Sequence, residues 1–188
     1  RPPPRGCACA TSDACRPLER IEGCGYGLAL RPSSRETPAM DSRPPLRHTI
    51  ATIGYRASRA LLDAPAAFGD FEPGSGIDSP LRILAHVNDV LGSAHARLLG
   101  IDFVRTAVSD WSTELARTFT CLERLDAAVA DGRATAASQW APLLQGPLSD
   151  VLTHIGQLAL LRRLFGRPVA SGVSYAVAPI EAGRVRYA

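Results

Sequence analysis

The feature that most constrains the fold is a recurrence of apolar residues at helical spacing, clearest in residues 147–166. These residues lie three or four positions apart, as on one face of an α-helix: Leu148, Val151, Leu152, Ile155, Leu158 and Ala159. Pro147 suits a first helical turn, where its missing N–H has no partner to lose. Gly166, which is followed by Arg-Pro, ends the pattern. The stretch therefore predicts an amphipathic helix.

Three earlier stretches share this periodicity and predict helices over residues 46–67, 80–100 and 105–130. The first is expected to bury Leu46, Ile50, Ile53, Ala57 and Leu61. The second is expected to bury Leu84, Val87, Leu91, Ala94 and Leu98. The third is expected to bury Val108, Trp111, Leu115, Phe119, Leu122, Leu125 and Val129.

The remaining segments lack a clear period. Residues 133–145 form a looser connection, and the tail after Gly166 is expected to lie extended across the helices. Four amphipathic helices without a convincing pair of strands predict an all-α protein, and specifically a four-helix bundle.

Residues 1–39 have no helical or strand period and carry four of the five cysteines. The only methionine is Met40, so we interpret residues 40–188 as the domain. Residues 1–39 are then an irregular, disordered extension or the product of an upstream reading frame. A transit peptide is an alternative, because the segment is rich in arginine and poor in acids. The cysteines at positions 7, 9, 15 and 24 could instead bind zinc, although their spacing matches no standard paired pattern. Cys121 is predicted to be a buried, inert thiol.

Composition and charge argue against two kinds of partner. The formal net charge of the 188 residues is only +3, and every basic residue is an arginine. No basic stripe with neighbouring aromatic residues is present, so no nucleic-acid partner is expected. No window approaches the roughly 20 apolar residues of a membrane-spanning helix. We therefore expect a cytoplasmic protein without a membrane span.

Two histidines and one carboxylate form a candidate metal site. Asp150 and His154 are four residues apart, so both side chains leave the same face of the last predicted helix. His86, at the edge of the apolar stripe of the second predicted helix, is the third candidate ligand. Two histidines and a carboxylate leave coordination positions open for water or substrate. Alternatively, Asp150 only stabilises a helix start and both histidines are ordinary boundary residues. His48 and His95 are expected to be solvated.

Two further residues of the last helix are candidates for supporting roles. Gln157 lies about one turn after His154 and could orient a metal ligand or a bound water molecule. Arg162 falls on the apolar side near the helix end. It could extend to solvent or contact an anionic group.

Three stretches resemble the DinB-like superfamily: SPLRILAHVNDVL, PLSDVLTHIGQLALLRRLFGRPV and YAVAPIEAGRV. In that family the second helix carries one histidine. The last helix carries a His-x-x-x-His pair whose second member opens a His-[Arg or small]-Gly-Gln run. By this resemblance, His86 corresponds to the first ligand and His154 to the third, while Asp150 replaces the middle histidine and adds a negative charge. The resemblance covers roughly residues 46–183 and implies a four-helix bundle.

The resemblance also implies a range of functions. The site would hold a divalent ion such as zinc, nickel or iron, and some members of the family are transferases that use a low-molecular-weight thiol. A metal-activated thiol or water would support group transfer or hydrolysis on a small-molecule substrate between the helices. The alternative is a non-catalytic helical bundle in which these residues are structural. Such a protein would act through its surface, as a homodimer or with another partner.

Overall fold

The computed structural model describes residues 41–134, 137–170 and 175–187. The predicted extension over residues 1–39 and its cysteines lie outside these ranges. Within the described ranges the secondary structure is entirely helical and contains no strand, as predicted. None of the helices in this part of the chain combines the length and apolar character needed to cross a membrane.

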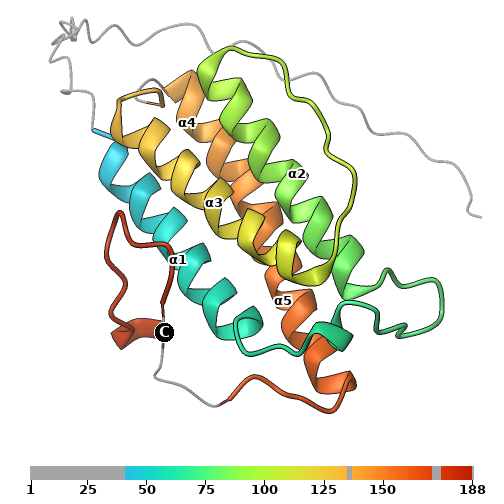
Figure 1. Ribbon diagram of the computed structural model, residues 1–188. Helices are drawn as coiled ribbons and strands as arrows, with labels where there is room; N and C mark the ends of the chain where they lie inside the picture. The colour runs from blue at the N-terminus through green and yellow to red at the C-terminus, as the bar shows by residue number, and fades with distance from the viewer. Residues whose placement is uncertain (1–40, 135–136, 171–174, 188) are drawn as a thin grey trace, which may run out of the picture. The chain divides into compact units, whose positions relative to one another are not determined.

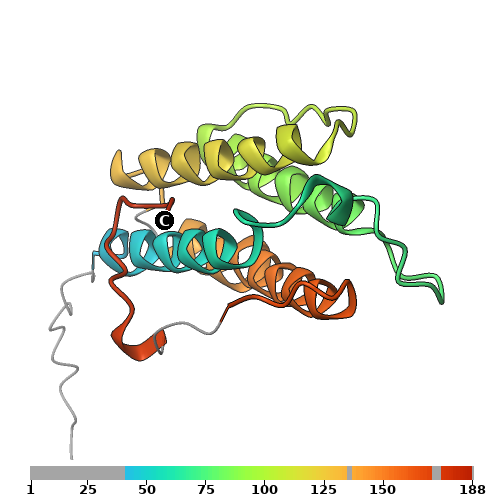
Figure 2. The ribbon, with the colours of Figure 1, turned by 60° about the horizontal axis from the view of Figure 1, so that its bottom comes forward.

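The long helices lie in two layers. They are α1 (Arg43–Leu61), α2 (Pro80–Leu99), α3 (Trp111–Ala130) and α5 (Ser149–Leu164), and the short α4 (Ala137–Leu143) precedes α5. α2 packs against α3 and α5, and α1 packs against the same two helices (Figure 1). Figure 2 shows α2 and α3 together in one layer and α1 and α5 in the other. The core lies between these layers.

The apolar stripes predicted for α1 and α2 are confirmed, apart from Leu98, which is half-buried. In α3 the prediction is wrong at Val108, which is 55% exposed, and Leu115 is half-buried. Cys121 is buried as predicted, and burial raises the pKa of its thiol. Helical periodicity thus identified most of the core correctly.

α1 is shorter than predicted, because it ends at Leu61 rather than near residue 67. Pro65 disfavours a helical conformation at the residue before it, so the chain turns away and resumes as a short 3₁₀ turn, Ala66–Phe68. Phe68 is fully buried, with its ring 5.2 Å from that of Trp111 and 5.5 Å from that of Phe165. The turn therefore closes one end of the core.

α3 begins at Trp111 rather than at residue 105. Asp110 caps the helix, because its carboxylate accepts hydrogen bonds from the backbone N–H of Thr113 at 3.0 Å and from the Thr113 hydroxyl at 2.7 Å. Residues 101–110 are irregular chain that runs along the outside of α2 and α3 (Figure 1). This explains why Val108 does not face the core.

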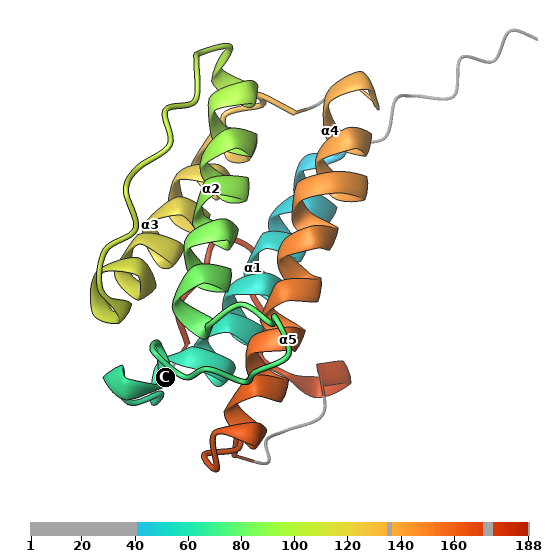
Figure 3. The same ribbon diagram turned by 90° about the vertical axis from the view of Figure 1, so that its right-hand side faces the viewer.

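The last helix begins earlier than predicted. α4, a π-helical turn (Leu144–Leu148) and α5 follow one another without a break, so residues 137–164 form a single rod (Figure 3). Pro147 cannot donate a backbone hydrogen bond, and the wider π turn accommodates it inside the rod. The Ser149 hydroxyl donates to the carbonyl oxygen of Leu144 at 2.7 Å. The segment predicted to be loose is thus partly helical.

The described part of the tail, residues 175–187, packs on α1. Val185 and Tyr187 are buried, and the backbone N–H of Tyr187 donates to the Ser58 hydroxyl at 3.0 Å. The Tyr187 ring meets Tyr55 edge-to-face at 5.2 Å. The described tail therefore lies against α1, but it is not extended throughout as predicted, because Tyr175–Val177 form a short 3₁₀ turn.

The close approach of the tail to α1 depends on Gly54. A Cβ at this position would overlap the backbone of Val185, whereas a Cβ at Gly156 in α5 would meet nothing within 4 Å. We expect Gly54→Ala to lower the free energy of unfolding by roughly 1–3 kcal/mol and to make the tail more sensitive to proteolysis. Gly156→Ala should instead raise it by roughly 0.5–1 kcal/mol. Urea unfolding of both variants tests this, and equal effects would contradict the packing described.

Candidate metal site

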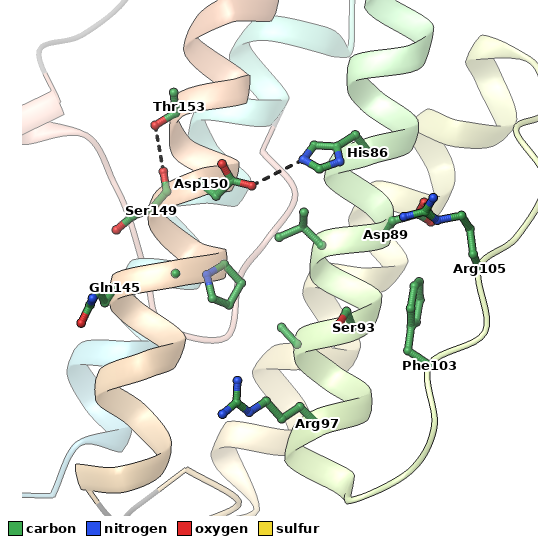
Figure 4. Close-up of a pocket in the computed structure, with 14 residues that line it drawn as sticks. His86, Asp89, Ser93, Arg97, Phe103, Arg105, Gln145, Ser149, Asp150 and Thr153 are labelled. Carbon is green, nitrogen blue, oxygen red and sulfur yellow. Dashed lines mark hydrogen bonds and ion pairs between the residues drawn. The ribbon is translucent and has the colours of Figure 1, made fainter.

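Three side chains predicted from the sequence come together between α2 and α5. His86 projects from α2, and Asp150 and His154 project from α5. One potential ligand atom from each lies within 4.8 Å of the others. The Nε2 atoms of His86 and of His154 each lie 3.5 Å from an Asp150 carboxylate oxygen. Figure 4 shows the approach of Asp150 to His86 across the space between the two helices.

Asp150 does not occupy a free helix start, because the rod begins at residue 137. Asp150 nevertheless lies in the first turn of α5, so the alternative, a carboxylate that stabilises a helix start, stays a prediction beside metal binding. The π turn ends directly before Ser149, and its wider winding rotates the residues that follow relative to a regular helix. The rod thus presents Asp150 and, one turn later, His154 toward His86 on α2.

Gln157 lies where the sequence predicted it, beside His154. Its Oε1 atom lies 2.8 Å from Nδ1 of His154. An amide oxygen can only accept a hydrogen bond, so this contact requires the proton on Nδ1, and in the neutral ring Nε2 is then the nitrogen that can coordinate a metal. This is the arrangement in which an imidazole coordinates a metal through Nε2 while a second residue fixes its orientation.

The cluster lies at one end of an open cleft of about 740 Å³, and His86 and Asp150 form part of its wall. The side chains of His86 and Asp150 are 50% and 46% exposed, and that of His154 is 20% exposed. Asp150 has no arginine partner in the described residues; its polar neighbours across the site are the two imidazoles. A cation in this position would therefore meet a carboxylate that no arginine neutralises.

The separations suit a small divalent ion. Bonds of about 2.0–2.1 Å in a tetrahedral zinc site place the ligand atoms roughly 3.3 Å apart. The two carboxylate–imidazole separations of 3.5 Å are close to that value, although they run to different oxygens of Asp150, Oδ2 for His86 and Oδ1 for His154. The widest separation, 4.8 Å at most, needs only a small side-chain rotation, which exposed side chains allow. The donor set of two nitrogens and one oxygen fits zinc, nickel or iron.

Arg162, the predicted anion contact, lies away from this cluster. Its side chain is 3% exposed and pairs with the Asp63 carboxylate. It also donates to the carbonyl oxygens of Ala60 at 2.8 Å and Arg167 at 3.0 Å. The anion that Arg162 contacts is therefore part of this chain, and the arginine holds the end of α5 to the end of α1.

The other two histidines stay outside the cluster. His48 is exposed, as predicted. His95 is half-buried rather than solvated, and burial, together with the nearby Arg124, lowers its pKa.

A buried polar network that the sequence patterns did not indicate supports the cleft. Glu114 is 1% exposed, and its carboxylate accepts hydrogen bonds from Asn88 Nδ2 at 2.7 Å and from the backbone N–H of Ser109 at 3.0 Å. Arg117 donates to the same carboxylate at 3.3 Å and to Asp89 at 3.0 Å. Glu114 thus joins α3 to α2 and anchors the end of residues 101–110.

That anchoring shapes one wall of the cleft. Phe103 and Arg105, both on the anchored segment, line the cleft (Figure 4), and Arg105 forms an ion pair with Asp89 of α2 at 3.0 Å. The sequence indicates the start of α3 but not the contact between α2 and α3. The Asp-Trp-Ser-Thr run at residues 110–113 is a typical helix start, whereas nothing local pairs Asn88 with Glu114.

Comparisons of the chain with protein-family models, with curated proteins and with solved structures gave no match.

The hydrogen bonds to the Glu114 carboxylate lead us to expect that an isosteric substitution of Glu114 lowers stability. Glu114→Gln replaces one acceptor oxygen by an NH₂ donor that faces other donors, so it should lower the free energy of unfolding by roughly 1–3 kcal/mol. It should also raise the protease sensitivity of residues 101–110. Glu123, exposed on the same helix, provides the control, and Glu123→Gln should change stability by less than about 0.5 kcal/mol. Similar unfolding curves for the two variants would contradict a stabilising role for the buried carboxylate.

Proposed function

We propose that residues 40–188 form a DinB-like four-helix bundle that binds a divalent metal ion through His86, Asp150 and His154. We further propose that it acts as a metal-dependent transferase or hydrolase, with a low-molecular-weight thiol as the co-substrate of a transferase. The observation that carries the proposal is the convergence of the three ligand atoms within 4.8 Å at one end of a cleft. The packing of α1 and α2 each against α3 and α5 supports the bundle.

The bound ion would lower the pKa of a coordinated thiol or water, so that a nucleophile is available near neutral pH. Side chains of the protein would orient the metal ligands and shape the space for the substrate. Gln157 fixes the His154 ring, and Asp150 contributes one negative charge. Phe103, on the anchored segment, lines the cleft and would help to exclude water from a substrate bound there.

The exposure of the cluster favours an enzyme over a purely structural metal site. Structural zinc sites are closed by four protein ligands, whereas catalytic sites keep a position open. Here His86 and Asp150 line a cleft of about 740 Å³, a volume typical of small-molecule sites. Homodimer formation and a cytoplasmic location remain predictions from the sequence.

Metal content tests the proposal directly. After reconstitution with zinc, nickel or iron and removal of excess ion, the full chain should retain close to one ion per molecule by elemental analysis. Gln157→Leu removes only the group that orients His154 and should weaken metal affinity by roughly 10–100-fold. His154→Ala removes a ligand and should weaken it further.

His48→Ala is the matched control, because His48 is an exposed histidine outside the cluster. It should bind metal as the unmodified chain does. Retention of metal by His154→Ala, or no metal in any of the proteins, would contradict the proposal.

A further inference from the structure

A charged side chain, that of Arg97, lies at the end of the cleft opposite the candidate metal site. On α2, Ser93 and Arg97 follow His86 by seven and eleven residues, which are close to two and three full helical turns. These residues therefore share one side of the helix, and all line the cleft. Eleven residues span about 16 Å along the helix axis. Figure 4 shows Arg97 at the opposite end of the cleft from His86, with its side chain extended toward the rod formed by α4 and α5.

Arg97 is the one charged group of the cleft wall that no described residue pairs with. Asp89 forms ion pairs with Arg105 and Arg117, each at 3.0 Å. Asp150 faces the two imidazoles of the candidate metal site. The Arg97 guanidinium has neither an ion pair nor a side-chain hydrogen bond within residues 41–134, 137–170 and 175–187.

An apolar strip lies between the two ends. Val90 and Ala94 of α2, Phe103 of the anchored segment and Pro147 of the π turn line it, with the polar Ser93, Gln145 and Ser149 beside them. Such a surface favours an extended apolar portion of a ligand. The cleft thus combines a metal-binding cluster, an apolar middle and an unpaired guanidinium in one line along α2.

We propose that Arg97 anchors the substrate through a carboxylate, so that the substrate spans the cleft. The substrate class is an elongated, largely apolar carboxylate whose other end carries the group that reacts at the metal cluster. A guanidinium presents parallel N–H donors that match the two oxygens of a carboxylate. Arg97 is then a residue that determines specificity, eleven positions from the nearest metal ligand. This inference rests on the proposed metal-dependent function.

The test uses thiols whose carboxylate is at the far end of an alkyl chain. The full chain is loaded with cobalt(II), whose absorption reports the metal site, and thiol binding is followed by the thiolate-to-cobalt charge-transfer band. Mercaptoundecanoic acid is compared with mercaptoundecanol, which has the same length without the charge. Mercaptopropionic acid serves as an acid too short to reach Arg97.

We expect the long acid to bind about tenfold more tightly than the long alcohol, because a charge-assisted hydrogen-bonded pair forms only with the acid. Arg97→Gln should abolish this difference without changing the affinity for the alcohol, and Arg97→Lys should retain part of it. Arg82→Gln is the matched control: Arg82 lies on the same helix, pairs with Asp78 at 2.9 Å and does not line the cleft. It should keep the full difference.

Three results would overturn the inference while leaving the metal site intact. They are equal binding of the long acid and alcohol, persistence of the difference in Arg97→Gln, and its loss in Arg105→Gln instead. Failure of the protein to bind cobalt(II) would overturn the proposed function and, with it, this inference. The cobalt spectrum recorded before any thiol is added therefore distinguishes the two failures.

Discussion

The buried carboxylate of Glu114 is the interaction on which the shape of the cleft depends. A charged group that is 1% exposed is tolerated only where hydrogen bonds replace its hydration, and here Asn88, Ser109 and Arg117 supply them. The donors come from α2, from the segment before α3 and from α3 itself. One carboxylate therefore joins α2, α3 and the end of the segment that carries Phe103 and Arg105, two residues of the cleft wall.

On the opposite wall, a proline inside a helix has a comparable role. Pro147 cannot take part in a regular α-helical hydrogen-bond ladder, so the rod widens into a π turn and then continues as α5. Asp150 and His154 follow directly after this turn. The backbone irregularity thus lies beside the candidate ligands on one wall of the cleft, and the buried polar network supports the other wall.

The sequence predicted the features that depend on local periodicity. The stripe from Leu46 to Leu61 is buried, and the helical spacing of Asp150 and His154 does place both side chains on the side that faces His86. Helix boundaries were predicted less well where two local signals compete. The apolar pattern predicted that α3 begins at residue 105, but the cap at Asp110 starts the helix at Trp111. The Asn88–Glu114 pair could not be predicted, because it joins residues on different helices through burial that no local pattern encodes.

The central claim is that His86, Asp150 and His154 hold one divalent ion at the end of the cleft. A crystal of the full chain grown with zinc, measured at the zinc absorption edge, tests it most directly. The account predicts one strong anomalous peak, about 2.0–2.2 Å from a nitrogen of each histidine and an oxygen of Asp150, with the remaining coordination open to the cleft. A peak elsewhere, no peak, or a fourth protein ligand that closes the site would contradict it.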